Sequence, residues 1–130
     1  MGRRFIAESI YQEFIDADDE AIRRLMARLI TGNDSGILVA LKGERIVGMF
    51  GLLVFHHFIS GELIAGEVFW WVEPEEREGS GGLRLLREAE KVATAVGAKK
   101  MQMVAPDERI GHLYERLGFK KMETTYQRSL

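Results

Sequence analysis

The sequence predicts an α/β fold with a mixed, mostly antiparallel central sheet and helices on both faces. Three apolar segments at residues 37–41, 45–58 and 63–72 are separated by short turns, which indicates an antiparallel meander. Helical periodicity then returns over residues 81–96, and a strand at 100–104 and a helix at 106–117 follow. This order of elements is typical of a mixed sheet with helices packed on it. At 130 residues, we expect one domain covering 1–130.

The segments outside this middle region are assigned from weaker patterns. Residues 4–15 have a loose helical pattern, and a second helix with its apolar face over residues 22–30 ends at Gly32-Asn33. Gly48 and Gly51 lie inside the long second strand, where they indicate a bulge or a close backbone approach. We expect a final strand or strand pair over residues 119–129.

Composition excludes several classes of function. The net charge of −2 does not attract the protein to nucleic acid or to an anionic membrane. The absence of cysteine excludes disulfides and a thiol nucleophile. With only three histidines and no cysteine, we expect no metal site. No apolar run is long enough to predict a membrane span and no signal peptide is recognisable, so we expect a cytoplasmic protein.

The segment between the third strand and the next helix is the most informative part of the chain. It reads Val72-Glu73-Pro74-Glu75-Glu76-Arg77-Glu78-Gly79-Ser80-Gly81-Gly82. A turn of this kind presents backbone N–H groups at the positive end of a helix dipole, which suits a phosphate. The three glycines allow a ligand to approach the backbone closely and allow positive φ angles. A plain turn would show similar glycines, and neither the P-loop nor the dinucleotide fingerprint is present.

The pattern Arg77-x-x-Ser80-x-Gly82 resembles motif A of the GNAT acetyltransferase superfamily, in which [QR]-x-x-G-x-[GA] wraps the pyrophosphate of acetyl-CoA. The lead-in Val72-x-Pro74-x-x-Arg77 and the pair Leu85-Leu86 are also similar to that family, and so is a second motif, Leu113-Tyr114-Glu115-Arg116-Leu117-Gly118-Phe119. The resemblance covers roughly residues 18–130. Ser80 and Asp107 depart from the usual Gly and Asn. The first strand of the family is missing or reduced to a stub at Arg3–Phe5.

The resemblance implies acetyl-CoA as co-substrate, an amine as acceptor and a homodimer. It places the diphosphate on residues 77–83, mainly through backbone N–H groups: Arg77, Glu78, Gly79, Ser80, Gly81, Gly82 and Leu83. Arg77 and Arg84 would supply positive charge, and the Val72 N–H would polarise the thioester carbonyl. Since no cysteine can carry an acyl group, we expect direct attack by the amine in a ternary complex.

Two residues are candidates for the proton transfers that acyl transfer to an amine requires. Glu67 is the candidate base because period-2 spacing places it on the face of Phe69 and Trp71, where desolvation raises the pKa of a carboxylate. The alternative is a solvated glutamate at the mouth of the strand. Tyr114 is the candidate acid, since the resemblance directs its phenol at the CoA sulfur. The alternative is a core tyrosine whose hydroxyl is hydrogen-bonded.

The acceptor side is less defined. Trp71 is a candidate for lining the acceptor pocket, and Trp70 points to the opposite face. His56 and His57 lie near the end of the long strand and are candidates for substrate binding or proton relay, or else ordinary hairpin residues. The loop residues Glu73, Glu75 and Glu76 are expected to be solvated charges.

Two other functions stay open. One is a non-catalytic CoA-binding or sensing domain, which Ser80 and the short N-terminus favour. The other is a phage-type acyltransferase that modifies nucleic acid, against which the net charge argues because phosphate binding needs clustered cations.

Overall fold

The computed structural model describes residues 1–130, which form two compact units. One unit is Glu20–Met103, and the other combines Met1–Asp19 with Val104–Leu130. Each unit is described by itself.

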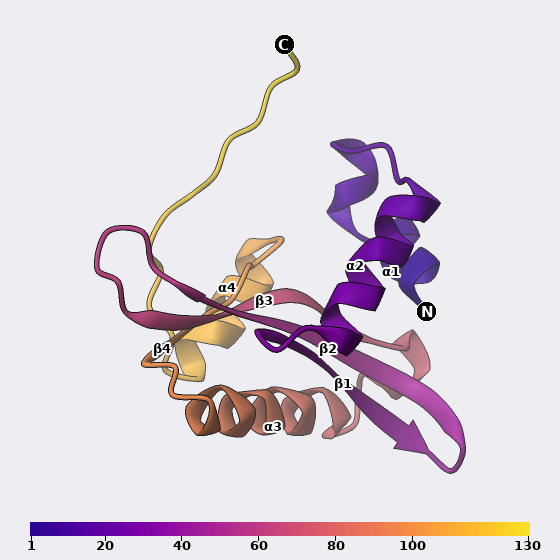
Figure 1. The fold of residues 1–130 in the computed structure, drawn as a ribbon. Coiled ribbons are helices and arrows are strands. Elements are labelled where there is room, and N and C mark those ends of the chain that lie inside the picture. The colour runs from indigo at the N-terminus through magenta and orange to yellow at the C-terminus, as the bar shows by residue number, and fades with distance from the viewer. The chain divides into compact units, whose positions relative to one another are not determined.

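The first unit is built on a four-stranded sheet with the order β1-β2-β3-β4. β1 (Ser35–Lys42), β2 (Arg45–His56) and β3 (Leu63–Val72) form the predicted antiparallel meander, and β4 (Lys100–Gln102) pairs parallel to β3 (Figure 1). The parallel pairing is short, because only Ile64, Ala65 and Gly66 of β3 have partners in β4. The rest of that edge of β3, from residue 67 onward, extends beyond β4.

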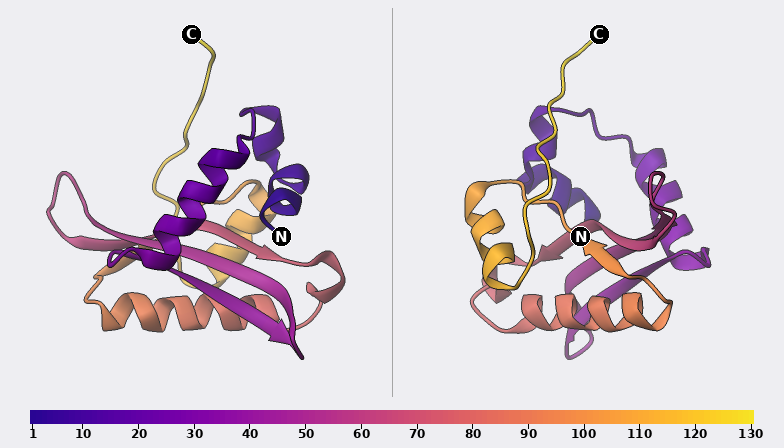
Figure 2. Two further views of the ribbon diagram at one scale, coloured as in Figure 1. Left: turned by 45° about the vertical axis from the view of Figure 1, so that its right-hand side comes forward. Right: turned by 90° about the vertical axis from the view of Figure 1, so that its left-hand side faces the viewer.

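Helices cover both faces of this sheet. α3 (Gly81–Ala95) packs on β1, β2 and β3, and α2 (Asp19–Thr31) lies on the opposite face (Figures 1 and 2). α3 is amphipathic, and its buried residues are spaced to form one face: Leu85, Leu86, Ala89 and Ala93. Phe50 and Leu52 of β2 are completely or almost completely buried, and each contributes about 2–3 kcal/mol by removal from water. The predicted fold class is therefore confirmed.

The two glycines of β2 have the predicted packing roles. A Cβ on Gly48 would lie 2.9 Å from Leu85 Cδ1, so glycine here lets α3 approach the sheet. A Cβ on Gly51 would lie 2.7 Å from the Phe69 ring. Each position also adjoins a break in register, between Ala40 and Leu41 of β1 and between Gly51 and Leu52 of β2.

The second unit contains α1 (Gly2–Glu8), a 3-10 turn η1 (Ile10–Glu13) and α4 (Glu108–Arg116). The pattern at residues 4–15 thus forms two short pieces, because Ser9 between them is extended (φ −94°, ψ 160°). No strand precedes α1. No helix in the structure has the length and apolarity needed to cross a bilayer.

The predicted strand over residues 119–129 is wrong. These residues form no regular element, and Met122 and Tyr126 are largely exposed. A strand needs a neighbouring edge for its backbone hydrogen bonds. The segment pairs with no strand, and near its end the Gln127 side-chain amide donates to the Phe14 carbonyl (2.9 Å).

Candidate active site

At the end of β3, the N–H and C=O groups of Val72 face the open edge of the sheet. The Glu73 N–H donates to the Val47 carbonyl (2.9 Å), and Val72 lies opposite Gly48 in the ladder. Because hydrogen-bonded and non-hydrogen-bonded pairs alternate in an antiparallel ladder, the N–H and C=O of Val72 point away from β2. They point toward the edge that β4 covers only as far as Gly66. The Val72 N–H is thus placed as a donor to a ligand lying along this edge.

The turn after β3 leads directly into the first turn of α3. The 3-10 turn η2 (Pro74–Glu76) follows the strand, and the first α-helical hydrogen bond runs from Arg84 N–H to the Ser80 carbonyl (3.0 Å). The N–H groups of Gly81, Gly82 and Leu83 precede that bond and lie at the positive end of a 15-residue helix. These three donors and the helix dipole suit a diphosphate.

The loop glycines give space rather than unusual backbone angles. None of Gly79, Gly81 and Gly82 has a positive φ, so that part of the prediction is wrong. A Cβ on Gly81 would meet nothing within 4 Å, and a Cβ on Gly82 would touch Val72 Cγ2 at 3.4 Å and Trp70 Cζ2 at 3.6 Å. A side chain at either position would fit the protein itself and would project from the first turn of α3, beside the N–H groups that a ligand would use.

Ser80 is the N-cap of α3 without acting as a side-chain cap. It has helical backbone angles (φ −80°, ψ −2°), and its hydroxyl makes no capping hydrogen bond. A serine therefore substitutes for the usual glycine without backbone strain, because a negative φ is open to any residue. The side chains of Glu78 and Ser80 are both exposed to solvent.

A group of ion pairs that the sequence analysis missed holds this turn from the β1–β2 hairpin side. The Glu76 carboxylate pairs with Lys42 (2.7 Å) and Arg45 (3.3 Å), and Glu75 pairs with Arg45 (3.4 Å). These partners are 30 or more residues apart in sequence, so no local pattern could reveal them. The expectation of a solvated charge holds for Glu75 but not for Glu73, which is only 6% exposed, or for Glu76, which is largely covered.

The candidate base Glu67 lies beside an irregularity in β3. Glu67 is opposite Leu52 and Phe69 is opposite Gly51, so Val68 is an extra residue in the ladder. Because Gly51 and Leu52 are consecutive in β2, this bulge places Glu67 and Phe69 on opposite faces. The prediction that Glu67 shares the face of Phe69 and Trp71 is therefore wrong. Glu67 is half-buried, and its role as base stays a prediction.

The two tryptophans point to opposite faces, as predicted. Trp70 lies opposite Phe50, with ring centroids 6.2 Å apart, and faces the first turn of α3. Trp71 lies opposite Met49, is 7% exposed and carries the Arg77 guanidinium on its ring. The assignment of Trp71 to the acceptor pocket is not tested by this packing.

His56 and His57 lie at the other end of β3. His56 pairs with Leu63, the first residue of β3. Leu63 lies nine residues before Val72, which corresponds to about 30 Å along the strand. His56 Nδ1 is 2.9 Å from the Gly61 carbonyl, and His57 Nδ1 accepts from the N–H groups of Ile59 (3.3 Å) and Ser60 (3.4 Å). Both rings thus organise the hairpin turn, and the structure does not bring them together with Trp71.

Tyr114 belongs to the second unit, near the end of α4. Its hydroxyl donates to the Val104 carbonyl at 3.3 Å, and its ring lies 5.7 Å from that of Phe119. The Phe119 N–H donates to the Tyr114 carbonyl (3.0 Å) and the Gly118 N–H to the Glu115 carbonyl (3.0 Å), with Gly118 at φ +94°. These bonds and the ring contact form a Schellman motif. Much of the Leu113–Phe119 motif is thereby explained as a helix C-cap.

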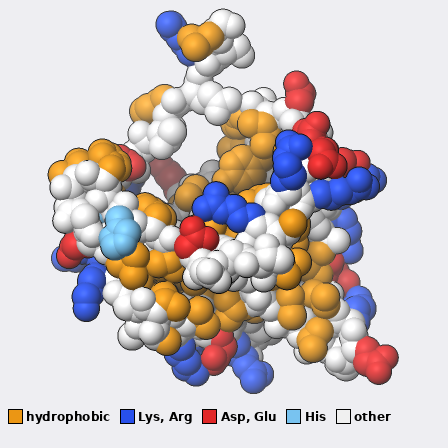
Figure 3. Space-filling model, viewed as in Figure 1, with side chains coloured by type: hydrophobic (Ala, Val, Ile, Leu, Met, Phe, Trp, Pro, Cys, Tyr) orange, Lys and Arg blue, Asp and Glu red, His pale blue; other side chains and the backbone are white.

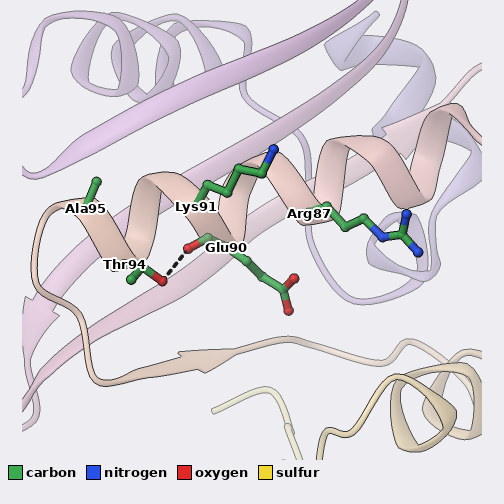
Figure 4. A pocket seen from close by; sticks show the side chains of 5 residues that line it. All are labelled: Arg87, Glu90, Lys91, Thr94 and Ala95. Atoms are coloured by element: carbon green, nitrogen blue, oxygen red, sulfur yellow. Dashed lines mark hydrogen bonds between the residues drawn. The ribbon is translucent and has the colours of Figure 1, made fainter.

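Two surface hollows lie on the first unit. One, of about 400 Å³, runs between the β1–β2 hairpin and the start of α3, and its lining includes Val72, Gly79, Gly81 and Arg84. The other, of about 520 Å³, is a shallow depression on the outer face of α3, formed by Arg87, Glu90, Lys91, Thr94 and Ala95 (Figure 4). Its side chains are ordinary solvated helix residues, so only the first hollow adjoins the candidate site.

Comparison with known protein families identifies the family of the chain. The profile of the acetyltransferase (GNAT) family matches residues 4–119, which is most of the chain. The chain belongs to the GNAT family. A search of the curated proteins found no match.

Solved structures show the same fold at low sequence identity. A transcriptional regulator from Bacillus halodurans is 19% identical with a TM-score of 0.79, over 98% of this chain and 89% of that one. AAC(6')-Iy, in complex with the bisubstrate analog CoA-S-monomethyl-acetylneamine, is 16% identical with a TM-score of 0.75, over 94% and 87%. The aminoglycoside 6'-N-acetyltransferase AAC(6')-IG from Acinetobacter haemolyticus is 18% identical with a TM-score of 0.72, over 98% and 90%.

For a GNAT protein, the residues of the β3–α3 turn fit an acyl-CoA. The first turn of α3 offers backbone N–H donors, and glycine leaves their approach open. Val72, the last residue of β3, supplies a further N–H donor. Together they match the anionic and the carbonyl parts of an acyl-CoA thioester.

Proposed function

We propose that this GNAT protein is an acetyl-CoA-dependent N-acetyltransferase, formed by residues 1–130 as a single domain. The observation that carries the proposal is the first turn of α3, where the N–H groups of Gly81, Gly82 and Leu83 precede the first helical hydrogen bond. Membership of the family supports acetyl transfer.

In the proposed reaction, the β3–α3 turn binds the diphosphate and the Val72 N–H donates to the thioester carbonyl. Such a donor is worth about 3 kcal/mol when charge develops on the oxygen in the transition state. The amine of the acceptor attacks the carbonyl carbon directly, and the C–S bond breaks as the C–N bond forms. Glu67, or a water molecule that it orients, takes the proton from the amine, and Tyr114 gives a proton to the departing thiolate.

The acceptor is a primary amine. Solved neighbours named as aminoglycoside acetyltransferases support including aminoglycosides among the candidates. The surface in Figure 3 shows acidic and basic side chains intermixed, without an extended basic area on that face, which favours a small acceptor over nucleic acid.

The test is a thermal-shift titration with acetyl-CoA and with CoA alone, followed by thiol release with spermidine, kanamycin and a lysine-containing peptide. We expect stabilisation by both cofactors and thiol release with at least one amine. Stabilisation without thiol release from any amine would favour the non-catalytic CoA-binding alternative. No stabilisation at all would contradict the proposal.

A further inference from the structure

Arg77 follows η2, and its side chain turns back over the end of β3. Its Nε donates to the Val72 carbonyl at 2.9 Å, and its Cζ lies 4.4 Å from the centroid of the Trp71 ring. The guanidinium is therefore stacked on an indole that is 7% exposed, with one N–H committed to the backbone. This arrangement differs from that of a cation extended toward the diphosphate.

The hydrogen bond replaces one that a neighbouring strand would make. The Val72 carbonyl points toward the edge of β3 that β4 leaves uncovered beyond Gly66. A carbonyl at such an edge needs a donor, and the Arg77 Nε–H is that donor. The contact with the Trp71 ring restrains the guanidinium, so the direction of the Nε–H donor is restrained as well.

The Val72–Glu73 peptide is held from two sides as a result. On one side the Glu73 N–H donates to Val47 (2.9 Å), and on the other Arg77 holds the Val72 carbonyl. The Val72 N–H, which the proposed function uses on the thioester carbonyl, belongs to the preceding Trp71–Val72 peptide. Because Trp71 pairs with Met49 in the ladder, the peptides on both sides of the Val72 Cα are held, and this N–H keeps one direction. Alignment of such a donor before the reaction is what makes it effective.

We infer that Arg77 is a positioning residue, which lies over Trp71 and holds the Val72–Glu73 peptide so that the adjacent Val72 N–H is aligned for the acyl carbonyl, rather than a ligand of the diphosphate. The inference rests on the proposed function. It reassigns a residue that the motif alone would place among the phosphate contacts.

The test compares Arg77→Gln and Arg77→Lys with Arg87→Gln, a matched control on the outer face of α3 (Figure 4). We expect the Kd for CoA, by calorimetry, to change no more than about threefold in the Arg77 variants, while kcat falls about 10- to 100-fold. The salt dependence of CoA binding should equal that of the wild type, because no phosphate contact is lost. Lysine keeps the charge but not the planar stack, so it should not restore kcat. Arg87→Gln should leave both constants unchanged.

NMR of the CoA-free protein tests the stack independently. We expect the Arg77 Nε–H resonance to be shifted upfield by the Trp71 ring and protected from exchange, and both effects to disappear in Trp71→Leu. A CoA affinity at least about tenfold weaker in Arg77→Gln, with a reduced salt dependence, would make Arg77 a phosphate ligand and overturn the inference. Full rescue of kcat by lysine, or absence of the shifted resonance, would also overturn it. Failure of the wild type to bind CoA would overturn the proposed function, and the positioning role with it.

Discussion

Substitution of Gly82 separates the stability of the fold from the binding of CoA. An alanine Cβ would make ordinary contacts with Val72 (3.4 Å) and Trp70 (3.6 Å), and φ is not positive, so no strain is expected. Alanine favours helix over glycine by up to about 1 kcal/mol, and by about half of that in a first turn. For a chain of this length, about 0.5 kcal/mol raises Tm by about 2 °C.

CoA binding should become weaker in the Gly82 variants, although Gly82→Ala makes the unliganded fold more stable. At about 100 times its Kd, CoA stabilises the wild type by about 2.7 kcal/mol, which is a Tm shift of about 10 °C. If the added methyl weakens binding about tenfold, the stabilisation falls to about 1.4 kcal/mol and the shift to about 5 °C. Gly82→Glu adds a carboxylate beside the diphosphate and should abolish the shift, while the unliganded fold persists because an acidic residue is favourable in the first turn of a helix.

The assay is differential scanning fluorimetry with and without CoA on Gly82→Ala, Gly82→Glu and a control, Gly36→Ala. Gly36 lies in β1, and a Cβ there would meet nothing within 4 Å, so the control should keep the full shift. A normal shift in Gly82→Glu would refute the assignment of the diphosphate to the first turn of α3. A loss of several degrees in unliganded Gly82→Ala would show that the glycine serves packing.

Four further predictions concern other parts of the chain. Tyr114→Phe should lower kcat with little change in CoA affinity, and should cost about 0.5–1 kcal/mol of unfolding free energy through its lost hydrogen bond, measured by urea denaturation. Glu67→Gln should lower kcat and remove the acidic limb of the pH–rate profile, since glutamine cannot accept the proton. Gly118→Ala should destabilise the protein by about 1 kcal/mol in urea, because its φ of +94° disfavours a Cβ. Lys100→Met should raise the pKa of Glu62, because hydrogen bonding and charge from Lys100 hold that pKa below its ordinary value in the wild type, as NMR titration would show.

Each of these has an outcome that would contradict it. Unaltered turnover in Tyr114→Phe would remove the phenol from the mechanism, and an unchanged pH profile in Glu67→Gln would assign the base elsewhere. Equal stability of Gly118→Ala and wild type would contradict the Schellman cap. Because the pKa of Glu62 is lower in the folded state, this group stabilises the folded protein at pH values above its unfolded-state pKa. The contribution is lost as the pH falls through the folded-state pKa. Glu62 is solvent-exposed, so added salt should weaken the effect, and a shift that resists salt would contradict this origin.

Sequence predicted the elements whose signals are local. The meander, α3 and α4 were predicted because strand alternation, helical periodicity and turn residues operate within a few positions. The glycines of β2 were predicted to allow close approach, and Leu85 and Phe69 are the side chains that occupy the space. The ion pairs of Glu76 with Lys42 and Arg45 could not be predicted, because only the folded hairpin brings these charges together.

The parity of a strand is the clearest case in which local spacing is insufficient. Period 2 predicts that residues 67, 69 and 71 share a face, and it is right for Phe69 and Trp71, which lie opposite Gly51 and Met49. One extra residue at Val68 reverses the parity for everything before it. Nothing in Val68 itself marks it as the bulged residue, since the bulge is a property of the pairing with β2 rather than of β3 alone.

The same reasoning applies to the end of β3, where function is proposed. The motif predicts that residues 72–83 bind an acyl-CoA, but it does not say which groups bind and which ones orient the binders. That distinction depends on where β4 stops pairing, because a carbonyl covered by a strand would need no arginine. Since β4 ends its pairing at Gly66, the Val72 carbonyl is left to Arg77, and a residue expected to hold a phosphate holds the backbone instead.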